Sequence, residues 1–416
     1  MAWLNKIHNP EKYFFWFCKW VLLSVLMGTI GGLLGTAFHY ALHFVTHLRL
    51  EHNWLVLLLP AAGLLSVAWY HLLKLRKNRG TNEIIDAVLH GEELKPQIAP
   101  GIFGAAVLTH LFGGSAGREG AALQLGGSAA SMLSKLLKLD SDDRRVLVMA
   151  GMSSVFAGLF RTPLTAALFC MEFENVGLIF TPALLPSYLA AYTASTVAGR
   201  LGVHAEGVLL TSYVGISPAQ TAACGVLAAL VAVLGIVMCK LFHEAEHLAA
   251  HHVRNPWLRI ALGGALIAAM TYAVGDHRFN GAGMDMALGA IEGTGEWYYF
   301  LLKMLFTAVT LAAGFKGGEI VPTFCIGATF GLTVGTMLGL DAELAAALGL
   351  IGLFCCATNS PLASIVMSVE MFGGANIHLF ALVCVVCFVL SGHSGLYSSQ
   401  IHQFHKASTN QSARES

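Results

Sequence analysis

Apolar residues form long, nearly uninterrupted runs along this chain, and charged residues gather at the ends of the runs. The runs lie at about 20–47, 54–73, 99–117, 146–173, 179–203, 217–241, 258–275, 299–313, 323–340, 343–357 and 377–391. A helix needs roughly 20 apolar residues to cross a bilayer core, so several runs can span it, whereas others are too short or too rich in glycine. The pattern predicts an all-α polytopic membrane protein with broken, tilted helices.

Composition agrees with a membrane protein. The chain is 56% hydrophobic and 12% charged, against roughly 25% charged in an ordinary soluble domain. Its formal net charge is zero, which gives no basic footprint for nucleic acid. Lys6, Lys12 and Lys19 precede the first run without a small-residue cleavage site, and Lys74–Arg79 follows the second. Basic residues at both places predict a retained first helix with a cytoplasmic N-terminus in the cell membrane.

A weak internal repeat divides the chain into two halves. The segment "PLTAALFCMEF" at 163–173 matches "PLASIVMSVEMF" at 361–372, and each places a glutamate nine positions after its proline. "GREGAALQLGG" likewise matches "GGEIVPTFCIG", and "NRGTNEIIDAVLHG" matches "FNGAGMDMALGAIEG", at an offset of about 200 residues. Such repeats are typical of inverted-repeat transporters. We expect one transmembrane domain over 1–416, with halves at about 20–203 and 217–400.

Glycine clusters interrupt the apolar pattern at 113–120, 280–283 and 314–318, each just before a new apolar helix. A backbone that leaves helical geometry inside a bilayer must be buried in protein or line a cavity. Each cluster therefore predicts a helix N-terminus inside the membrane, where free N–H groups and the helix dipole favour an anion. The sequence predicts an anion pathway.

Two acids and one phenol are candidate site residues. Glu119 follows the first break, so its carboxylate can take the place of an anion and leave when protonated. Glu319 follows "GFKGG" in the same relation, where the alternative is a structural pair with Lys316. Tyr397 can donate to an anion or serve as an interfacial anchor. Glu172 and Glu370 end apolar helices, and we expect them to bond backbone amides.

The sequence contains little that indicates an enzyme or a metal site. Histidines number 18, and the group in "FHEAEHLAAHH" places His247 and His251 on one helical face, where we expect them to meet headgroups or solvent. The sequence predicts no metal and no cofactor. An intramembrane enzyme using Glu119 and Glu319 would need a nucleophile beside a base, and none is evident.

The combined motifs resemble the CLC family of chloride channels and proton-coupled anion transporters. "GREGA" at 117–121 resembles the family motif GREGP, "GGEIVP" at 317–322 resembles GxFxP, and "FRTPLTAALFCMEF" resembles the helix after the first motif. The resemblance implies a homodimer of the short prokaryotic type, without a C-terminal regulatory domain, that carries halide anions (chloride or fluoride). It implies a gating role in proton transfer for Glu119, with Glu319 as a possible secondary acid. It further implies that anions bind at Gly120, Ala121, Glu319, Ile320, Val321, Tyr397 and Thr81.

Departures from the family pattern bear on the transported ion. The serine motif is missing near 78–82, where Gly80, Thr81 or Asn82 stands instead, and the family's internal proton-transfer glutamate maps onto Phe173. These losses, with the extra acid in "GFKGGE", resemble the fluoride-transporting branch. Val321 points the other way, because that branch favours threonine and valine cannot donate a hydrogen bond. We expect anion/proton antiport with fluoride slightly favoured; the alternative is a passive chloride channel.

Overall fold

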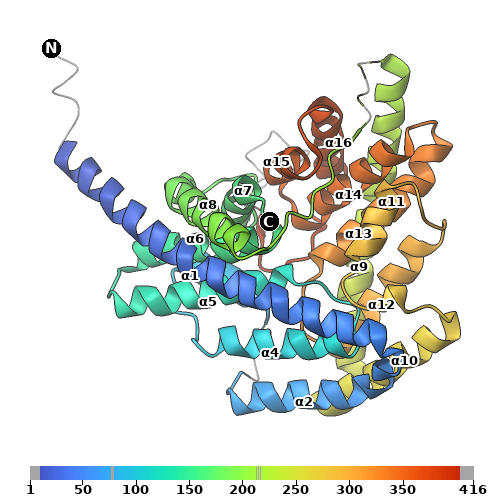
Figure 1. Cartoon of the computed structure of the whole chain (residues 1–416), viewed down its shortest axis with the longest axis horizontal. Coiled ribbons are helices and arrows are strands. Elements are labelled where there is room, and N and C mark those ends of the chain that lie inside the picture. The colour runs from blue at the N-terminus through green and yellow to red at the C-terminus, as the bar shows by residue number, and fades with distance from the viewer. Residues whose placement is uncertain (1–9, 76–78, 212, 214, 216, 403–416) are drawn as a thin grey trace, which may run out of the picture.

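The computed structural model describes residues 10–75, 79–211, 213, 215 and 217–402, which fold almost entirely into helices (Figure 1). The α-helices of the first half are α1 (Pro10–Glu51), α2 (Leu59–Leu72), α3 (Thr81–His90), α4 (Ile98–Leu111), α5 (Glu119–Leu136), α6 (Ser141–Phe160), α7 (Pro163–Glu172) and α8 (Leu184–Arg200). Those of the second half are α9 (Pro218–His252), α10 (Pro256–Val274), α11 (Met284–Ile291), α12 (Tyr299–Ala313), α13 (Ile320–Met337), α14 (Ala342–Thr358), α15 (Pro361–Phe372) and α16 (Ile377–Leu390).

Short elements complete the described chain. The 3-10 helices η2, η3 and η4 lie at Asn53–Leu58, Thr181–Ala183 and His277–Phe279. Strands β1 (Asn175–Val176) and β2 (Ile401–His402) pair in parallel and tie the end of the described chain to the loop after α7.

The order and length of the helices repeat from one half to the other. Each half begins with a long helix, 42 residues in α1 and 35 in α9, and α5 and α13 both have 18 residues. The pairs α3 and α11, α5 and α13, and α7 and α15 are the segments that the sequence repeat matched. The all-α repeat architecture expected from the sequence is therefore confirmed.

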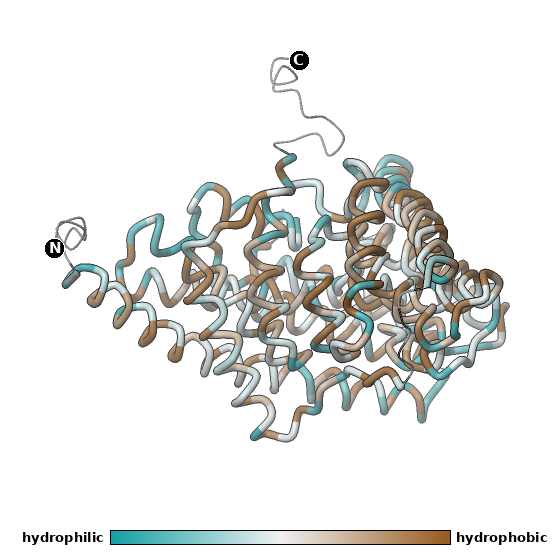
Figure 2. Tube along the Cα trace, turned by 90° about the horizontal axis from the view of Figure 1, so that it is seen from above, coloured by the Kyte–Doolittle hydropathy of each residue, from teal (hydrophilic) through white to brown (hydrophobic). Residues whose placement is uncertain are grey.

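Within the described part of the chain, five helical segments are long and apolar enough to cross a membrane, and others are shorter apolar helices. Hydrophobic residues fill the middle of the molecule, and hydrophilic residues gather mainly at turns along its edges (Figure 2). The predicted run 146–173 is two helices and not one, because the chain turns at Arg161 in a left-handed conformation before Pro163 opens α7. Three of the basic residues that predict a cytoplasmic N-terminus, Lys6, Arg76 and Lys77, lie outside the described residues.

Helices α7 and α15 cap each other. The Glu172 carboxylate accepts hydrogen bonds from the N–H groups of Leu362 (3.1 Å) and Ala363 (2.9 Å). The Glu370 carboxylate accepts from Leu164 (3.0 Å) and Thr165 (2.8 Å) in the same way. The expectation that both acids bond backbone amides is confirmed, and the reciprocity locks the two halves together through charge-assisted bonds.

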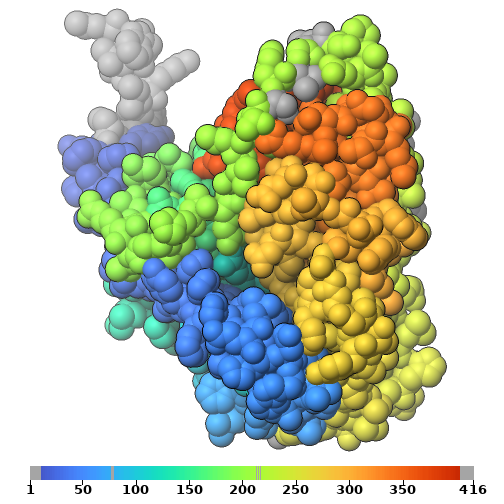
Figure 3. Space-filling model, turned by 45° about the vertical axis from the view of Figure 1, so that its right-hand side comes forward, coloured from blue at the N-terminus to red at the C-terminus, as the bar shows by residue number. Residues whose placement is uncertain are grey.

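Residues 201–211, which follow α8, run across the surface towards the second half (Figure 3). Two contacts hold this stretch: Val203 O accepts from Arg161 at 3.3 Å, and Thr211 N donates to the Glu343 carboxylate at 3.1 Å. Between these points, Glu206 forms an ion pair with Arg118. The connection therefore belongs to the packed molecule and touches the loop before α5.

Candidate functional site

The two broken segments meet in the interior of the molecule. Gly117 and Gly318 exchange backbone hydrogen bonds of 2.6 and 2.7 Å in an isolated antiparallel bridge, just before α5 and α13 begin. A side chain on Gly318 would place its Cβ 2.7 Å from Gly120 N and 2.9 Å from Glu119 N. Only glycine permits this approach, which brings two helix N-termini to one point.

The carboxylate of Glu119 occupies that point. Its side chain is fully buried, and Oε2 accepts from the N–H of Arg118 and from the N–H of Val321, both at 3.1 Å. Oε1 has no hydrogen-bond partner among the described residues. The sequence led us to expect the N–H groups of Gly120 and Ala121; the structure instead offers one donor from each half. The side-chain carboxyl group therefore already fills the place that the helix ends provide.

Thr81 and Glu319 lie on the other side of Gly120. A Cβ on Gly120 would stand 3.0 Å from the Thr81 hydroxyl and 3.6 Å from Glu319 Oε2, which has no partner in the described chain. Glu319 is partly exposed and precedes Ile320, the first residue of α13. No ion pair between Glu319 and Lys316 is found among the described residues; the Lys316 ammonium lies 5.1 Å from the Tyr70 ring centre.

Tyr397 is positioned by the ends of α7 and α14. Gln400 donates to Phe173 O at 2.7 Å and to Thr358 O at 2.8 Å, which fixes the loop that carries the tyrosine. The phenol is buried, its hydroxyl has no partner in the described part of the chain, and its ring meets Phe173 edge-on at 5.9 Å. Tyr397 thus lies in the interior and not at an interface.

Of the three candidates for the missing serine, Thr81 is the one whose hydroxyl faces Gly120. Gly80, the residue before α3, has a positive φ of 64° and brings no side chain. The Asn82 amide oxygen accepts from Ser399 N at 3.1 Å, so this side chain holds the Tyr397 loop against α3. Helix α3 therefore contributes both a hydroxyl and a brace for the phenol.

Arg118 points away from the Glu119 carboxylate. Its guanidinium forms an ion pair with Glu206, contacts His39 at 3.4 Å and lies 5.1 Å from the Phe160 ring centre. The side chain thus anchors the interhalf segment, while the backbone N–H serves Glu119. His247 and His251, the group singled out in the sequence, are exposed, with ring centres 6.4 Å apart.

Comparison with known proteins assigns the family. Residues 62–392 match the family described as "Voltage gated chloride channel". The chain belongs to this family. A "Chloride/fluoride channel protein" of Pseudomonas syringae pv. tomato is 34% identical over 95% of this chain and 90% of its own length.

Solved structures agree with this assignment. A CLC-type fluoride/proton antiporter is 31% identical, with a TM-score of 0.90 over 92% of this chain and 98% of its own. A slow cyanobacterial Cl−/H+ antiporter, 19% identical, shares the fold with a TM-score of 0.75, covering 89% of this chain and 94% of its own. The chain is therefore a multi-pass membrane protein of an anion-transporting family.

Sequence reasoning missed Lys303 and Gln124. Lys303 is completely buried in α12 and donates to Ser115 Oγ (3.0 Å), Phe279 O (3.2 Å) and Gly281 O (2.6 Å). It is a single lysine inside the apolar run 299–313, a signal that by itself marks a candidate functional residue. Gln124 donates to Gly120 O at 3.1 Å and leaves its own amide oxygen without a partner in the described chain.

Proposed function

We propose that this protein exchanges a halide for protons across the membrane, with fluoride favoured over chloride and Glu119 as the gate. The observation that carries the proposal is the Glu119 carboxylate, bonded by one backbone N–H from each half where an anion would bind. Similarity to a fluoride/proton antiporter and to a chloride/fluoride channel protein supports the choice of ions.

The gate works by protonation. Ionised Glu119 holds the N–H groups of Arg118 and Val321 and thereby excludes a competing anion. A proton that binds the carboxylate removes its charge, weakens both charge-assisted hydrogen bonds and frees the two donors for a halide. When the proton leaves, the carboxylate returns and displaces the anion. Each cycle therefore links the movement of a proton to that of a halide.

Further residues extend the pathway from Glu119. Gly120, Ala121 and Ile320 supply the remaining backbone of the two helix ends, and Thr81 and Tyr397 supply hydroxyl groups. Glu319, with an unpartnered oxygen near Gly120, is the second acid that we propose for relaying protons, since Phe173 stands where the family has a glutamate.

A passive channel is the second candidate. Phe173 is fully buried and cannot carry a proton, which favours uncoupled flow, and the relative from Pseudomonas syringae is called a channel protein. Purified protein in vesicles distinguishes the two: under a fluoride or chloride gradient, antiport drives protons uphill, whereas a channel gives only electrical anion flux. Uncoupled flux in the wild-type protein would overturn the antiport proposal. Uphill movement that persists in Glu119→Gln would remove Glu119 from the gate.

We further propose a homodimer in the cell membrane with a cytoplasmic N-terminus, in which each chain is one transmembrane domain with its own pathway. Exposed apolar residues on α8, α15 and α16, among them Tyr192, Leu362 and Val385, support a surface that meets lipid or a second copy. Cross-linking in native membranes tests the dimer, and a fusion reporter at the N-terminus tests the orientation.

A further inference from the structure

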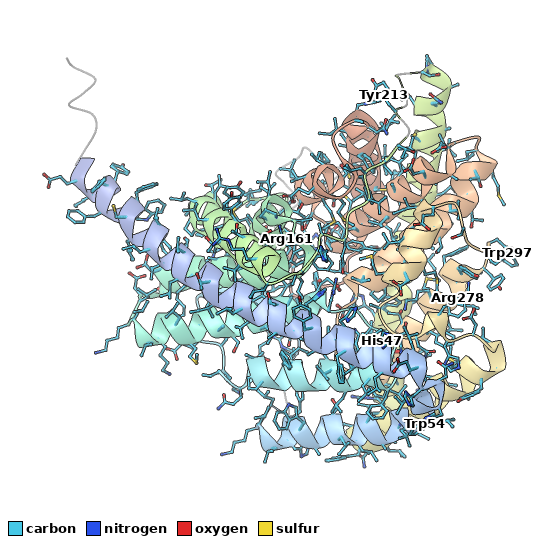
Figure 4. The ribbon with its side chains drawn as sticks, in the orientation of Figure 1. His47, Trp54, Arg161, Tyr213, Arg278 and Trp297 are labelled. Carbon is cyan, nitrogen blue, oxygen red and sulfur yellow. The ribbon has the colours of Figure 1, made fainter. Side chains whose placement is uncertain are left out.

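A cavity of about 610 Å³ opens beside the gate, on the side that Arg118 and Val321 line. Five histidines and three arginines line it, against three acids. His39, His43 and His47 come from successive turns of α1, and His277 and Arg278 come from the other half. Figure 4 shows His47 and Arg278 on the same face of the molecule. We call this space the histidine-lined cavity.

Arg49, also in the cavity wall, is a buried cation without a matching anion. The residue is 6% exposed, and Nη1 has no hydrogen-bond partner among the described residues. No carboxylate lies within 4.0 Å of its guanidinium in the described part of the chain. A buried guanidinium in this state carries a desolvation cost. Asp285 attracts this cation from beyond ion-pair distance but is exposed to solvent, so it offsets the cost only in part.

Lys303 adds a second buried charge to the same spot. Its ammonium donates to Gly281 O at 2.6 Å, and a Cβ on Gly281 would lie 2.9 Å from Arg49 Nη1, so both cations contact one glycine. The acceptors of Lys303 are two carbonyls and a hydroxyl, none of which carries charge. None of the described residues places a negative charge within ion-pair distance of Arg49 or Lys303. The two cations therefore create a positive field around Gly281 that is not neutralised locally.

The turn at Gly281 is the repeat partner of the turn at Gly80. Gly80 and Thr81 open α3 beside Gly120, whereas Ala282 and Gly283, which follow Gly281 and precede α11, lie in the wall of the histidine-lined cavity. Gly283 precedes α11 with a φ of 90° and no side-chain cap. The second half thus presents an uncapped helix N-terminus beside Arg49, at the position where the first half lines the ion pathway.

We infer that the histidine-lined cavity contains a capture site for a small monovalent anion, held by the Arg49 guanidinium and the first turn of α11. Lys303 supplies a fixed positive charge behind the turn. The inference rests on the proposed transport, because the site binds the halide before the Glu119 side chain leaves its position.

His110 lines the same cavity but does not donate to the anion. Its Nδ1 lies 2.8 Å from Ala106 O and donates to it, which makes Nε2 of the neutral ring an acceptor.

The acids of the cavity do not occupy this site. Glu206 is paired with Arg118, and Asp285 and Glu296 are exposed to solvent. Of these two exposed acids, Asp285 is closer in sequence to the proposed anion site, because it lies in the first turn of α11. Its charge opposes the anion, so removing it should strengthen capture.

Bromide locates the site directly. Crystals of the full chain grown in bromide should show an anomalous peak between the Arg49 guanidinium and the backbone of 282–285. The peak should disappear in Arg49→Gln and persist in Arg200→Gln, an exposed arginine outside the cavity. Bromide peaks elsewhere in the pathway with none at Arg49 would overturn the inference.

Transport measures the consequence. With halide varied in proteoliposomes, Arg49→Gln should raise the half-saturating concentration about tenfold and leave the maximal rate and the proton-to-halide ratio unchanged. Arg49→Lys should restore part of the affinity. Should the buried Arg49 variants fail to fold, Asp285→Asn on the surface should lower the half-saturating concentration about twofold.

The outcomes separate this site from the proposed function. An unchanged half-saturating concentration in both Arg49→Gln and Asp285→Asn would overturn the capture site while leaving proton exchange intact. If the wild-type protein moves halide without moving protons, the antiport proposal is overturned, whatever the bromide density shows at Arg49.

Discussion

The repeat relates two pairs of glutamates, and the two pairs differ in their hydrogen bonding. Glu172 and Glu370 are related by the repeat, and each has both carboxylate oxygens bonded to backbone N–H groups of the other half. Glu119 and Glu319 are related in the same way, but Glu119 Oε1 and Glu319 Oε2 have no partner among the described residues. The first pair is symmetric and satisfied, and the second is asymmetric and unsatisfied.

The difference teaches how to separate structural from functional acids inside a membrane. A buried carboxylate whose two oxygens both accept hydrogen bonds stabilises the fold, because the donors compensate its charge. A buried carboxylate with an orphaned oxygen is held less firmly and can exchange its partners for an anion or a proton. Position in the repeat alone does not distinguish the two, because all four glutamates follow the same internal symmetry.

The largest effect should come from neutralising Glu119, with Glu172 neutralised in the same way for comparison. Glu119→Gln should abolish proton-driven halide uptake, a fall of at least about a hundredfold, because an amide cannot bind and release the proton. Glu172→Gln should keep the coupling ratio, since that acid is a cap. The ratio of protons to halide in proteoliposomes checks both, and loss of coupling in Glu172→Gln would contradict the comparison.

Removing a cap should reduce stability without changing mechanism. Glu172→Ala or Glu370→Ala removes two charge-assisted bonds to a helix N-terminus and should lower the free energy of unfolding by about 2–4 kcal/mol. Thermal inactivation in detergent measures the effect, with the exposed Glu292→Ala as the control. A normal coupling ratio in the surviving protein is expected; a stability equal to that of the control would show that the caps contribute nothing.

The contact between the two broken segments can be tested at glycine. Gly318→Ala would place a Cβ 2.7 Å from Gly120 N, so the bridge to Gly117 must open and the helix ends must separate. Halide flux should fall by up to about a hundredfold, as expected when positioning groups are displaced by about 1 Å. Gly374→Ala is the matched control, because a Cβ there meets nothing within 4 Å. Equal flux in the two variants would argue against the bridge as a fixed part of the site.

The smallest effect concerns ion choice. Val321→Thr adds a hydroxyl to the residue whose N–H holds Glu119, and one added hydrogen bond of about 1 kcal/mol should favour fluoride over chloride about fivefold. Competing fluxes of the two ions measure the ratio. Val321→Ala separates the hydroxyl from a change of volume, and a similar shift in both variants would attribute selectivity to space alone.

Much of this protein could be predicted from local patterns. The apolar runs, the repeat and the glycine breaks indicated a membrane fold of two halves with helix ends inside, and Glu119 followed from its place after a break. The division of 146–173 could not be predicted, because Arg161 takes a left-handed conformation that no local pattern requires. Nor could the partners of Arg118, since Glu206 approaches it from a distant segment.

The sequence by itself determined that this chain folds in a membrane, that it is built from two related segments, and that Glu119 begins a helix after a glycine break, because hydropathy and spacing are local properties. Only the tertiary structure decided that the donors to Glu119 come from both halves, that Thr81 and not Asn82 faces Gly120, and that Arg49 and Lys303 meet at Gly281. Those facts depend on contacts between residues far apart in the chain, which are set by the packing of whole helices.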